Sequence, residues 1–243
     1  MARGEAARGG AGQVPSVRAR RRRWPRRVLL GLVAVALLPV LLTFAYTILR
    51  PPSLPMIGRW LTLQGAERRW IALSEVSPSL VVAVLTAEDA RFCAHGGVDW
   101  SAMREVLGEA DEDGPSRGAS TLTMQTVKNL YLWPLPTLVR KGAEIPLSLL
   151  ADGVLGKRRV LEIYLNVAEW GEGLYGAEAA ARRHFAKPAK ILNAREAALL
   201  AAALPSPRTR DPGKPGPRHR ALAGAVTRRM ASEALDTSCL VRG

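Results

Sequence analysis

The chain has 243 residues, enough for one domain of ordinary size with a terminal extension, and 48% of them are apolar, so a core can be buried. Its formal net charge is +14. Two cysteines, Cys93 and Cys239, are too few for a disulfide framework and lack the spacing of a metal site. They could pair in an oxidising compartment, but Cys239 falls in a tail, so we expect two free thiols.

The first 27 residues contain nine Arg and one Glu and so hold more than half of the net charge. Such a block can bind nucleic acid, direct targeting, or flank a membrane span. Residues 28–49 decide between these, because they carry no charge and would reach roughly 33 Å as a helix, across a hydrocarbon core of about 30 Å. A cleavable signal peptide is shorter and ends at small residues, whereas Arg50-Pro51-Pro52 follows here. We predict a single transmembrane helix at 28–49.

The arginine cluster also predicts the orientation of this helix. By the positive-inside rule, residues 1–27 form a cytoplasmic tail and everything after residue 50 lies outside the cytoplasm. Residues 50–56 are rich in proline and are expected to form a stiff linker.

From about residue 57 to 205 the patterning is helical, and no segment alternates with period two, so the fold class is predicted to be mainly α. Ser77-Pro78 is a typical helix start, Asp99 can cap a helix over 100–109, and Asn193 with Glu196 forms a capping box. Further helices are expected at 121–132, 138–150 and 157–169, with Pro146 kinking or ending the second of them. Residues 205–219 contain five prolines and are expected to form an exposed loop.

The first candidate for chemistry is Glu88-Asp89-x-x-Phe92-x-x-His95-x-Gly97-x-Asp99. Glu88 and Asp89 end an apolar helix, and a carboxylate at the edge of a core is a candidate for a raised pKa and for acid–base catalysis. The alternative is a capped helix end with solvated acids.

Two cationic segments follow. Thr121, Gln125 and Lys128 fall on one helix face, where they suit an anionic ligand such as phosphate or simply form a solvated face. In Arg140-Lys141-x-x-Glu144, the Arg and the Glu either pair on a helix surface or hold a diphosphate and position reacting groups.

Three more motifs complete the series: Lys157-x-x-Val-Leu-Glu-x-Tyr164-Leu-Asn166, Gly173-x-Tyr-Gly176-x-x-x-Ala180, and Glu196-Ala-Ala-x-Leu-Ala-x-x-Leu-Pro205. In this order, over residues 57–207, the motifs resemble glycosyltransferase family 51, the glycosyltransferase domain of peptidoglycan synthases, and more narrowly its monofunctional biosynthetic transglycosylases. The resemblance implies a lysozyme-like, two-lobed helical domain at 57–207, behind the transmembrane helix, with 208–243 as a basic C-terminal extension.

The resemblance also implies roles for individual residues. The catalytic base falls at Glu88 and a second functional acid at Glu144. The implied substrate-binding residues are Asp89, Phe92, His95, Thr121, Gln125, Lys128, Asn129, Arg140 and Lys141. The chain departs from the family pattern at four places: Met124, where the family commonly has Gln before Gln125, and Pro146, Asp152 and Gly156-Lys157. The last three fall in and after the motif that begins at Arg140, so the local geometry there is expected to differ from that of the family.

The implied activity is polymerisation of lipid II into β-1,4-linked glycan strands with release of undecaprenyl diphosphate, in cell wall biogenesis and cell shape. The resemblance implies a bacterial inner membrane protein with a periplasmic catalytic domain. Because fewer than 40 residues follow the last motif, no transpeptidase domain is expected. The expected partners are lipid II, the growing glycan, the membrane and other cell-wall synthesis and division proteins, with no nucleic acid. The resemblance leaves open a divalent cation, Mg²⁺ or Mn²⁺, at the diphosphate, and implies no organic cofactor and no dedicated metal site.

Two rival functions stay open at this stage. A lytic transglycosylase or hydrolase would also use a lysozyme-like fold with two acids, although glycan cleavage has no anionic leaving group for the cations to meet. A non-catalytic membrane scaffold would have no need for the motif acids and cations.

Overall fold

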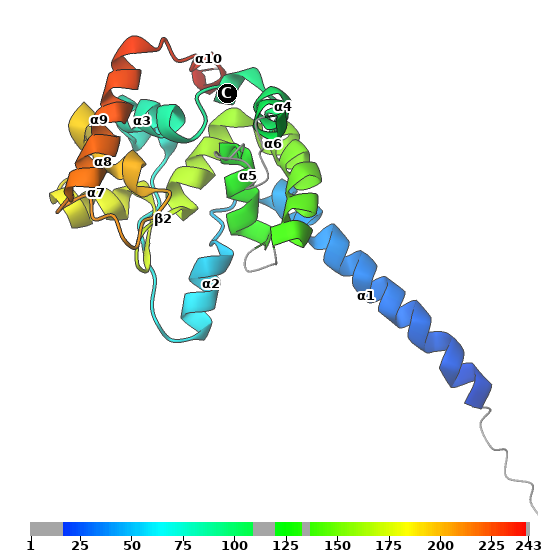
Figure 1. The fold of residues 1–243 in the computed structure, drawn as a ribbon. Helices are drawn as coiled ribbons and strands as arrows, with labels where there is room; N and C mark the ends of the chain where they lie inside the picture. The colour runs from blue at the N-terminus through cyan, green and yellow to red at the C-terminus, as the bar shows by residue number, and fades with distance from the viewer. Residues whose placement is uncertain (1–16, 109–119, 133–136, 242–243) are drawn as a thin grey trace, which may run out of the picture. The chain divides into compact units, whose positions relative to one another are not determined.

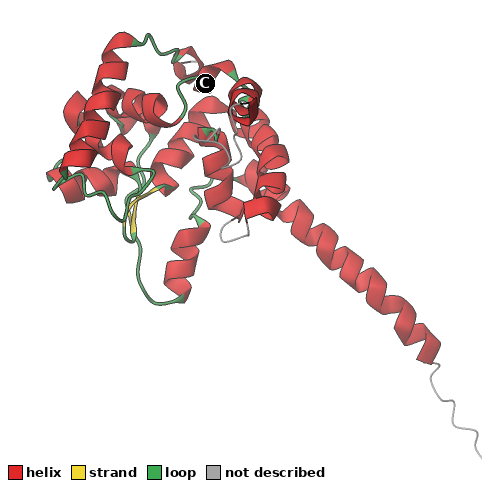
Figure 2. Cartoon of the chain, viewed as in Figure 1, coloured by secondary structure: helices red, strands yellow, loops and turns green. Residues whose placement is uncertain are grey.

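The structure is a computed structural model, and it describes residues 17–108, 120–132 and 137–241. The elements in chain order are α1 (Val17–Ala45), α2 (Leu54–Leu61), β1 (Glu67–Arg68), η1 (Leu73–Glu75), α3 (Pro78–Glu88), η2 (Phe92–Ala94), α4 (Trp100–Gly108), α5 (Leu122–Val127), η3 (Lys128–Leu132), α6 (Thr137–Val167), β2 (Glu169–Gly171), β3 (Leu174–Tyr175), α7 (Ala177–Phe185), η4 (Ala189–Ile191), α8 (Ala194–Ala203), α9 (Pro217–Ser232) and α10 (Ser238–Val241). The predicted mainly α fold is confirmed (Figure 2).

The N-terminal helix α1 is long and apolar enough to cross a membrane over residues 24–45. It ends at Ala45, earlier than predicted, and residues 46–48 form turns, because the Arg50-Pro51-Pro52 segment cannot continue a helix. The chain divides into two compact units, residues 1–38 and residues 39–243, so residues 39–45 at the end of α1 belong to the second unit.

The core of the second unit is built on α3, α8 and α9. Small side chains let α8 approach α3 closely, and Ala197, Ala198 and Ala201 are fully buried there. The C-terminal helix α9 covers this pair with Ala223 and Val226. The segment after residue 207 therefore folds into the same compact unit as the rest of the domain.

Local capping signals are confirmed at three helix starts. The Ser77 hydroxyl accepts a hydrogen bond from the Leu80 amide, and Asn193 and Glu196 form the reciprocal capping box. Asp99 accepts hydrogen bonds from the amides of Ser101 and Ala102 at the start of α4. These helices begin where local chemistry satisfies their first amides.

Three strands that the periodicity does not predict form a small sheet in the order β1-β3-β2. β1 pairs with β3 in parallel and β2 pairs with β3 antiparallel. Each strand has two or three residues, too short for period-two alternation to be detected.

The prediction that Pro146 ends or kinks its helix is wrong. α6 runs through Pro146, which is exposed, so the carbonyl group left without a partner at Gly142 can be solvated. The backbone leaves helical geometry at Gly156 instead, with φ 71° and ψ 162°, a region open essentially to glycine alone. Lys157 then reaches back across this break to pair with Asp152 at 2.7 Å.

The expectation of two free thiols is also wrong. Cys93 and Cys239 form a disulfide across 146 residues, with their Cα atoms 5.5 Å apart. The tail is not free because α10 packs on α6, where Leu240 is buried and its carbonyl accepts a hydrogen bond from Arg158 at 3.0 Å. The cross-link therefore joins the C-terminal region to the segment that follows Glu88.

We predict that Gly156→Ala lowers the free energy of unfolding by about 1–3 kcal/mol, because alanine is strained at this φ and ψ. Gly153→Ala is the matched control: it lies in the same helix with open space around its Cβ position, and there alanine should stabilise by about 0.5–1 kcal/mol. Thermal unfolding of the two variants measures the contrast, and equal midpoints would contradict the assigned break.

Candidate active site

Glu88 is the last residue of α3, and its carboxylate is held by an amide. Gln125, on α5, donates a hydrogen bond from Nε2 to Glu88 Oε2 at 2.8 Å. The hydroxyl of Tyr164, fully buried on α6, donates to Gln125 Oε1 at 3.1 Å. Because Tyr164 occupies the carbonyl side of the amide, the nitrogen side of Gln125 faces Glu88.

The surroundings of Glu88 make it a stronger base than a solvated glutamate. Burial raises its pKa, while the hydrogen bond from Gln125 and the positive charges of Lys128 and Arg210 act in the opposite direction and only partly offset the burial. A carboxylate with a raised pKa is a stronger proton acceptor than a solvated one, which suits it to general base catalysis.

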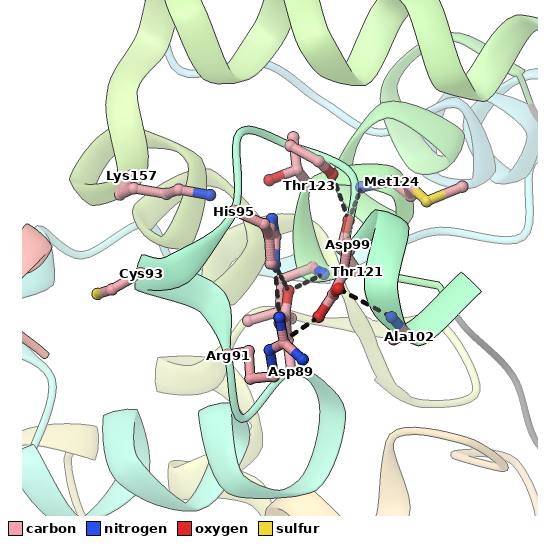
Figure 3. Close-up of polar contacts among 12 residues, drawn as sticks. Asp89, Arg91, Cys93, His95, Asp99, Ala102, Thr121, Thr123, Met124 and Lys157 are labelled. Carbon is pink, nitrogen blue, oxygen red and sulfur yellow. Dashed lines mark hydrogen bonds and ion pairs between the residues drawn. The ribbon is translucent and has the colours of Figure 1, made fainter. Parts of the chain in front are cut away.

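Asp89, the residue next to Glu88, is hydrogen-bonded to other parts of the chain (Figure 3). Its carboxylate lies 3.0 and 3.1 Å from Nε2 of His95 and accepts a hydrogen bond at 2.9 Å from the amide of Leu122, the first residue of α5. This one side chain ties the end of α3 to the loop after it and to the helix that carries Gln125. Asp89 is therefore a structural junction directly beside the candidate base.

The loop of the first motif is held by close packing as well. The Thr121 hydroxyl donates to the carbonyl oxygen of Gly97 at 2.6 Å and caps α5 by accepting from the Met124 amide. Gly97 has φ 84°, and a Cβ there would collide with the backbone carbonyl of Ser148 on α6. Only glycine allows this approach of the loop to α6.

A pocket of about 350 Å³ opens beside Glu88. Its charged lining consists of four carboxylates and two guanidinium groups: Glu88, Asp89, Asp99, Glu105, Arg91 and Arg229. Arg91 lies 3.4 Å from Asp99, and Arg229 comes from α9. Helix α9 thus contributes to the wall of the pocket that holds the candidate base.

The cationic residues form a second group. Glu144 on α6 is buried, with 1% of its side chain exposed, and lies 3.0 Å from Nε of Arg140 and 2.9 Å from Nζ of Lys141. The Arg and the Glu of this motif do pair on the helix, as one alternative predicts. Arg140 and Lys141 nevertheless remain partly exposed, so the other alternative, binding of a diphosphate, stays open. Glu144 holds two cations side by side, because a buried carboxylate requires such partners.

Lys128 connects the two groups. It begins η3, a π-helix that continues α5, and burial lowers its pKa, as do the charges of Arg140 and Lys141. The carboxylates of Glu144 and Glu88 act in the opposite direction. Lys128 thus lies within electrostatic reach of both the candidate base and the cation pair. Short π-helical segments such as η3 are often found at functional sites.

The other predicted substrate-binding residues are placed less directly. Phe92 is buried in the main core, under Nζ of Lys157 at 4.5 Å from the ring centroid. Thr121 and His95 are engaged in the hydrogen bonds described above, and Asn129 follows Lys128 in η3 and is partly exposed. Met124, where the family often has Gln, is buried, so it offers no polar contact.

Three contributors were not singled out from the sequence. Tyr164 lies within a quoted motif, but its role depends on a contact with Gln125 that spacing alone does not reveal. Arg210 and Arg229 come from the proline-rich segment and from the C-terminal extension, where their basic character was the only signal.

Among the described residues, no group of three or more His, Cys, Asp and Glu side chains comes together as a metal site would require. The acid nearest to the cations, Glu144, is already paired with Arg140 and Lys141. This donor set does not fit a divalent ion held by the protein itself.

A family model described as transglycosylase matches residues 56–231. The chain is 47% identical over 222 residues to the biosynthetic peptidoglycan transglycosylase of Brucella suis biovar 1, covering 89% of this chain and 99% of that protein. It is 48% identical over 222 residues to the protein of the same name from Mesorhizobium japonicum, covering 90% and 94%. The same-named protein of Rhodospirillum centenum is 50% identical over 208 residues, covering 85% and 90%.

We predict that Gln125→Met raises the pKa of Glu88 further, because it removes the donor that stabilises the carboxylate while keeping the side-chain volume. A ¹³C NMR titration of the glutamate carboxyl groups measures this pKa. Tyr164→Phe is the control, since Glu88 keeps its donor there and its pKa should move less. An unchanged pKa in Gln125→Met would show that the hydrogen bond does not act on Glu88.

Proposed function

Because the chain belongs to the transglycosylase family, we propose that it polymerises lipid II with Glu88 as the catalytic base. The family match shows the class of enzyme, a peptidoglycan glycosyltransferase of cell wall synthesis. The observation that carries the residue assignment is the position of Lys128, which couples electrostatically to Glu88 and to the Arg140–Lys141–Glu144 group. This coupling supports a site in which a base and a set of cations for an anionic leaving group act on the same substrate.

In the proposed reaction, Glu88 removes the proton from the 4-hydroxyl of the acceptor sugar. The resulting oxygen nucleophile forms a bond to the anomeric carbon of the donor, and the bond from that carbon to the diphosphate breaks. The electron pair leaves with undecaprenyl diphosphate. Attack on the side opposite the leaving group converts the α-linked donor to a β-1,4 linkage.

The cations act on the leaving group. Negative charge builds on the diphosphate as its bond to the sugar breaks, and preorganised cations in a partly buried site stabilise that charge. We assign this role to Lys128, Arg140 and Lys141. Glu144 is assigned a positioning role, because its buried carboxylate holds the last two in place.

No step is assigned to Mg²⁺ or Mn²⁺. The groups beside Lys128 on α6 are mainly cationic, and Glu144, the buried carboxylate between Arg140 and Lys141, is already paired, so it is not a free oxygen ligand for such ions. Polymerisation assayed with and without a chelator tests whether an ion carried by the diphosphate contributes.

The proposed location of the catalytic domain is the periplasmic side of the inner membrane. The arginine-rich segment before α1 supports a cytoplasmic N-terminus. The Cys93–Cys239 disulfide gives independent support, because disulfides persist in oxidising compartments and are rare in the cytosol.

We predict that Glu88→Gln lowers the rate of glycan synthesis from lipid II by roughly 10²–10⁴-fold, the usual contribution of a general base. Gel analysis of glycan products in detergent measures the rate, and the thermal midpoint should stay unchanged. Glu75→Gln, on a partly exposed segment outside the pocket, is the matched control and should keep full activity. Substantial synthesis by Glu88→Gln would refute the assignment. Release of muropeptides from finished peptidoglycan by the wild-type chain would favour a lytic enzyme instead.

Lys128→Met is predicted to lower kcat/KM for lipid II by roughly 10²-fold, as removal of one preorganised charge-stabilising group does. It should also move the acidic limb of the pH–rate profile to higher pH, because the charge of Lys128 opposes the rise in the pKa of Glu88. Lys128→Arg keeps the charge and should leave that limb near its wild-type position. If both variants turn over lipid II normally, Lys128 has no role at the diphosphate.

A further inference from the structure

A basic trough runs along the segment between α8 and α9. In Figure 1, β2, α7, α8 and α9 lie together on the left of the second unit. The trough consists of two hollows of about 510 and 480 Å³, which share Thr209, Arg210 and Asp211. The ends of β2 and α7 line the first hollow, and the start of α9 lines the second. Hollows of this size are typical of ligand sites.

Four cations of the trough have no ionic partner. Among the residues that the structure describes, no carboxylate lies within 4 Å of the charged groups of Arg183, Arg210, Lys214 and Arg218. The other two cations, Arg59 and Arg208, lie 3.9 Å from Glu172 and 3.2 Å from Glu169. Glu67, the remaining glutamate of the trough, pairs with an arginine as well. The trough therefore has positive charge to offer a ligand.

Asp211 shapes the trough without neutralising it. Its carboxylate accepts a hydrogen bond from the amide of Gly213 at 2.8 Å and lies 3.0 Å from Nδ1 of His184. Burial lowers the pKa of His184, so this ring is neutral near neutral pH and Asp211 keeps its negative charge. The four unpaired cations outweigh this single acid. The loop they stand on is held by hydrogen bonds before any ligand arrives, which lowers the cost of binding.

Arg210 connects the trough to the proposed catalytic base. Its guanidinium donates to the carbonyl oxygen of Ala202 on α8 at 2.8 Å, and its charge acts on Glu88. Lys128, from the group assigned to the diphosphate, acts on Glu88 as well. Glu88 is thus coupled to one cation from each of two sets that share no residue.

A buried histidine adds a hydrogen-bonding group at the wall of the second hollow. The side chain of His219 lines this hollow, and its Nε2 lies 2.8 Å from the carbonyl oxygen of Leu199. Because a carbonyl oxygen only accepts, Nε2 donates, and Nδ1 of the neutral ring is an acceptor. No residue in the described part of the chain donates to Nδ1. A ligand that carries N–H groups matches this acceptor, whereas the oxygens of an ionised phosphate do not.

We propose that the trough binds the peptide of lipid II through its carboxylates. This inference rests on the proposed function, because lipid II combines sugars, an apolar lipid, a diphosphate and a peptide. Only the diphosphate and the peptide are charged, and the first is assigned to Lys128, Arg140 and Lys141. A second set of unpaired cations is therefore left for the peptide, whose carboxylates suit arginine and whose N–H groups suit Nδ1 of His219. Binding there holds the attached sugar near Glu88, since Arg210 belongs to the surroundings of both.

Binding of a soluble peptide tests the recognition without catalysis. The full-length protein in detergent is titrated against a fluorescein-labelled N-acetylmuramyl pentapeptide, which has no lipid and no diphosphate, and anisotropy gives Kd. Arg183→Gln/Arg218→Gln should weaken binding roughly tenfold, as loss of charge-assisted hydrogen bonds does. Lys190→Gln/Arg195→Gln removes two exposed cations outside the trough and should bind like wild type. Equal binding by the two double variants, or displacement of the peptide by equimolar pyrophosphate, would overturn the proposal.

A second arm places the trough in the reaction. Arg183→Gln/Arg218→Gln should raise KM for lipid II roughly tenfold and leave kcat near wild type, because the peptide is remote from the reacting atoms. With lipid II whose peptide carboxylates are converted to amides, the variant and wild type should have the same KM, since the charge that the arginines meet is gone. If the variant raises KM equally for both substrates, the trough does not recognise the carboxylates. A wild-type chain that binds the muramyl peptide but does not polymerise lipid II would refute the proposed function and leave the binding result to decide the trough.

Discussion

The carboxylate of Asp89 is the junction on which the arrangement of the site depends. It receives the first amide of α5 and the imidazole of His95 at the point where α3 ends. Because a buried carboxylate needs such donors, the three segments cannot separate without leaving a charge unsatisfied. Glu88 precedes this junction and Gln125 follows it on α5, so their contact is a consequence of the anchor at Asp89. Of the two adjacent acids, Asp89 therefore has the structural contacts, and Glu88 is the one proposed as the base.

The same physical constraint separates the roles of Glu88 and Glu144. Both are held away from bulk water, but Glu144 lies between two cations whereas Glu88 faces an amide and more distant charges. Both carboxylate oxygens of Glu144 are engaged by these two cations. A carboxylate with a raised pKa and one neutral donor accepts a proton more readily. Glu144 thus holds Arg140 and Lys141 together, whereas Glu88 is the acid that suits the proposed proton transfer.

Features that depend on neighbouring residues were predictable from the sequence, and features that depend on distant contacts were not. The caps at Ser77, Asp99 and Asn193 were predicted because a side chain and the amides it satisfies lie within a few residues. The sequence predicts a break in α6 at Pro146, but the backbone leaves helical geometry at Gly156. An exposed proline costs the helix only one hydrogen bond, whereas the positive φ at Gly156 takes the chain out of the helical region. The orientation of Gln125 by Tyr164 required two helices to meet. The order and spacing of the motifs identify Glu88, Gln125 and Lys128 as candidate site residues. The structure joins Gln125 to Glu88 by a hydrogen bond and brings Lys128 within electrostatic reach of Glu88.

The Cys93–Cys239 bond has a consequence for the biogenesis of the enzyme. The bond encloses residues 93–239, so in the proposed periplasmic location the loop that follows Glu88 receives this restraint only after α10 has crossed the bilayer and met an oxidant. Copies retained in the cytosol would lack the bond, and their first motif would be joined to the rest of the domain by noncovalent contacts alone. In the proposed location, completion of the loop beside Glu88 is thereby linked to export of the domain across the membrane.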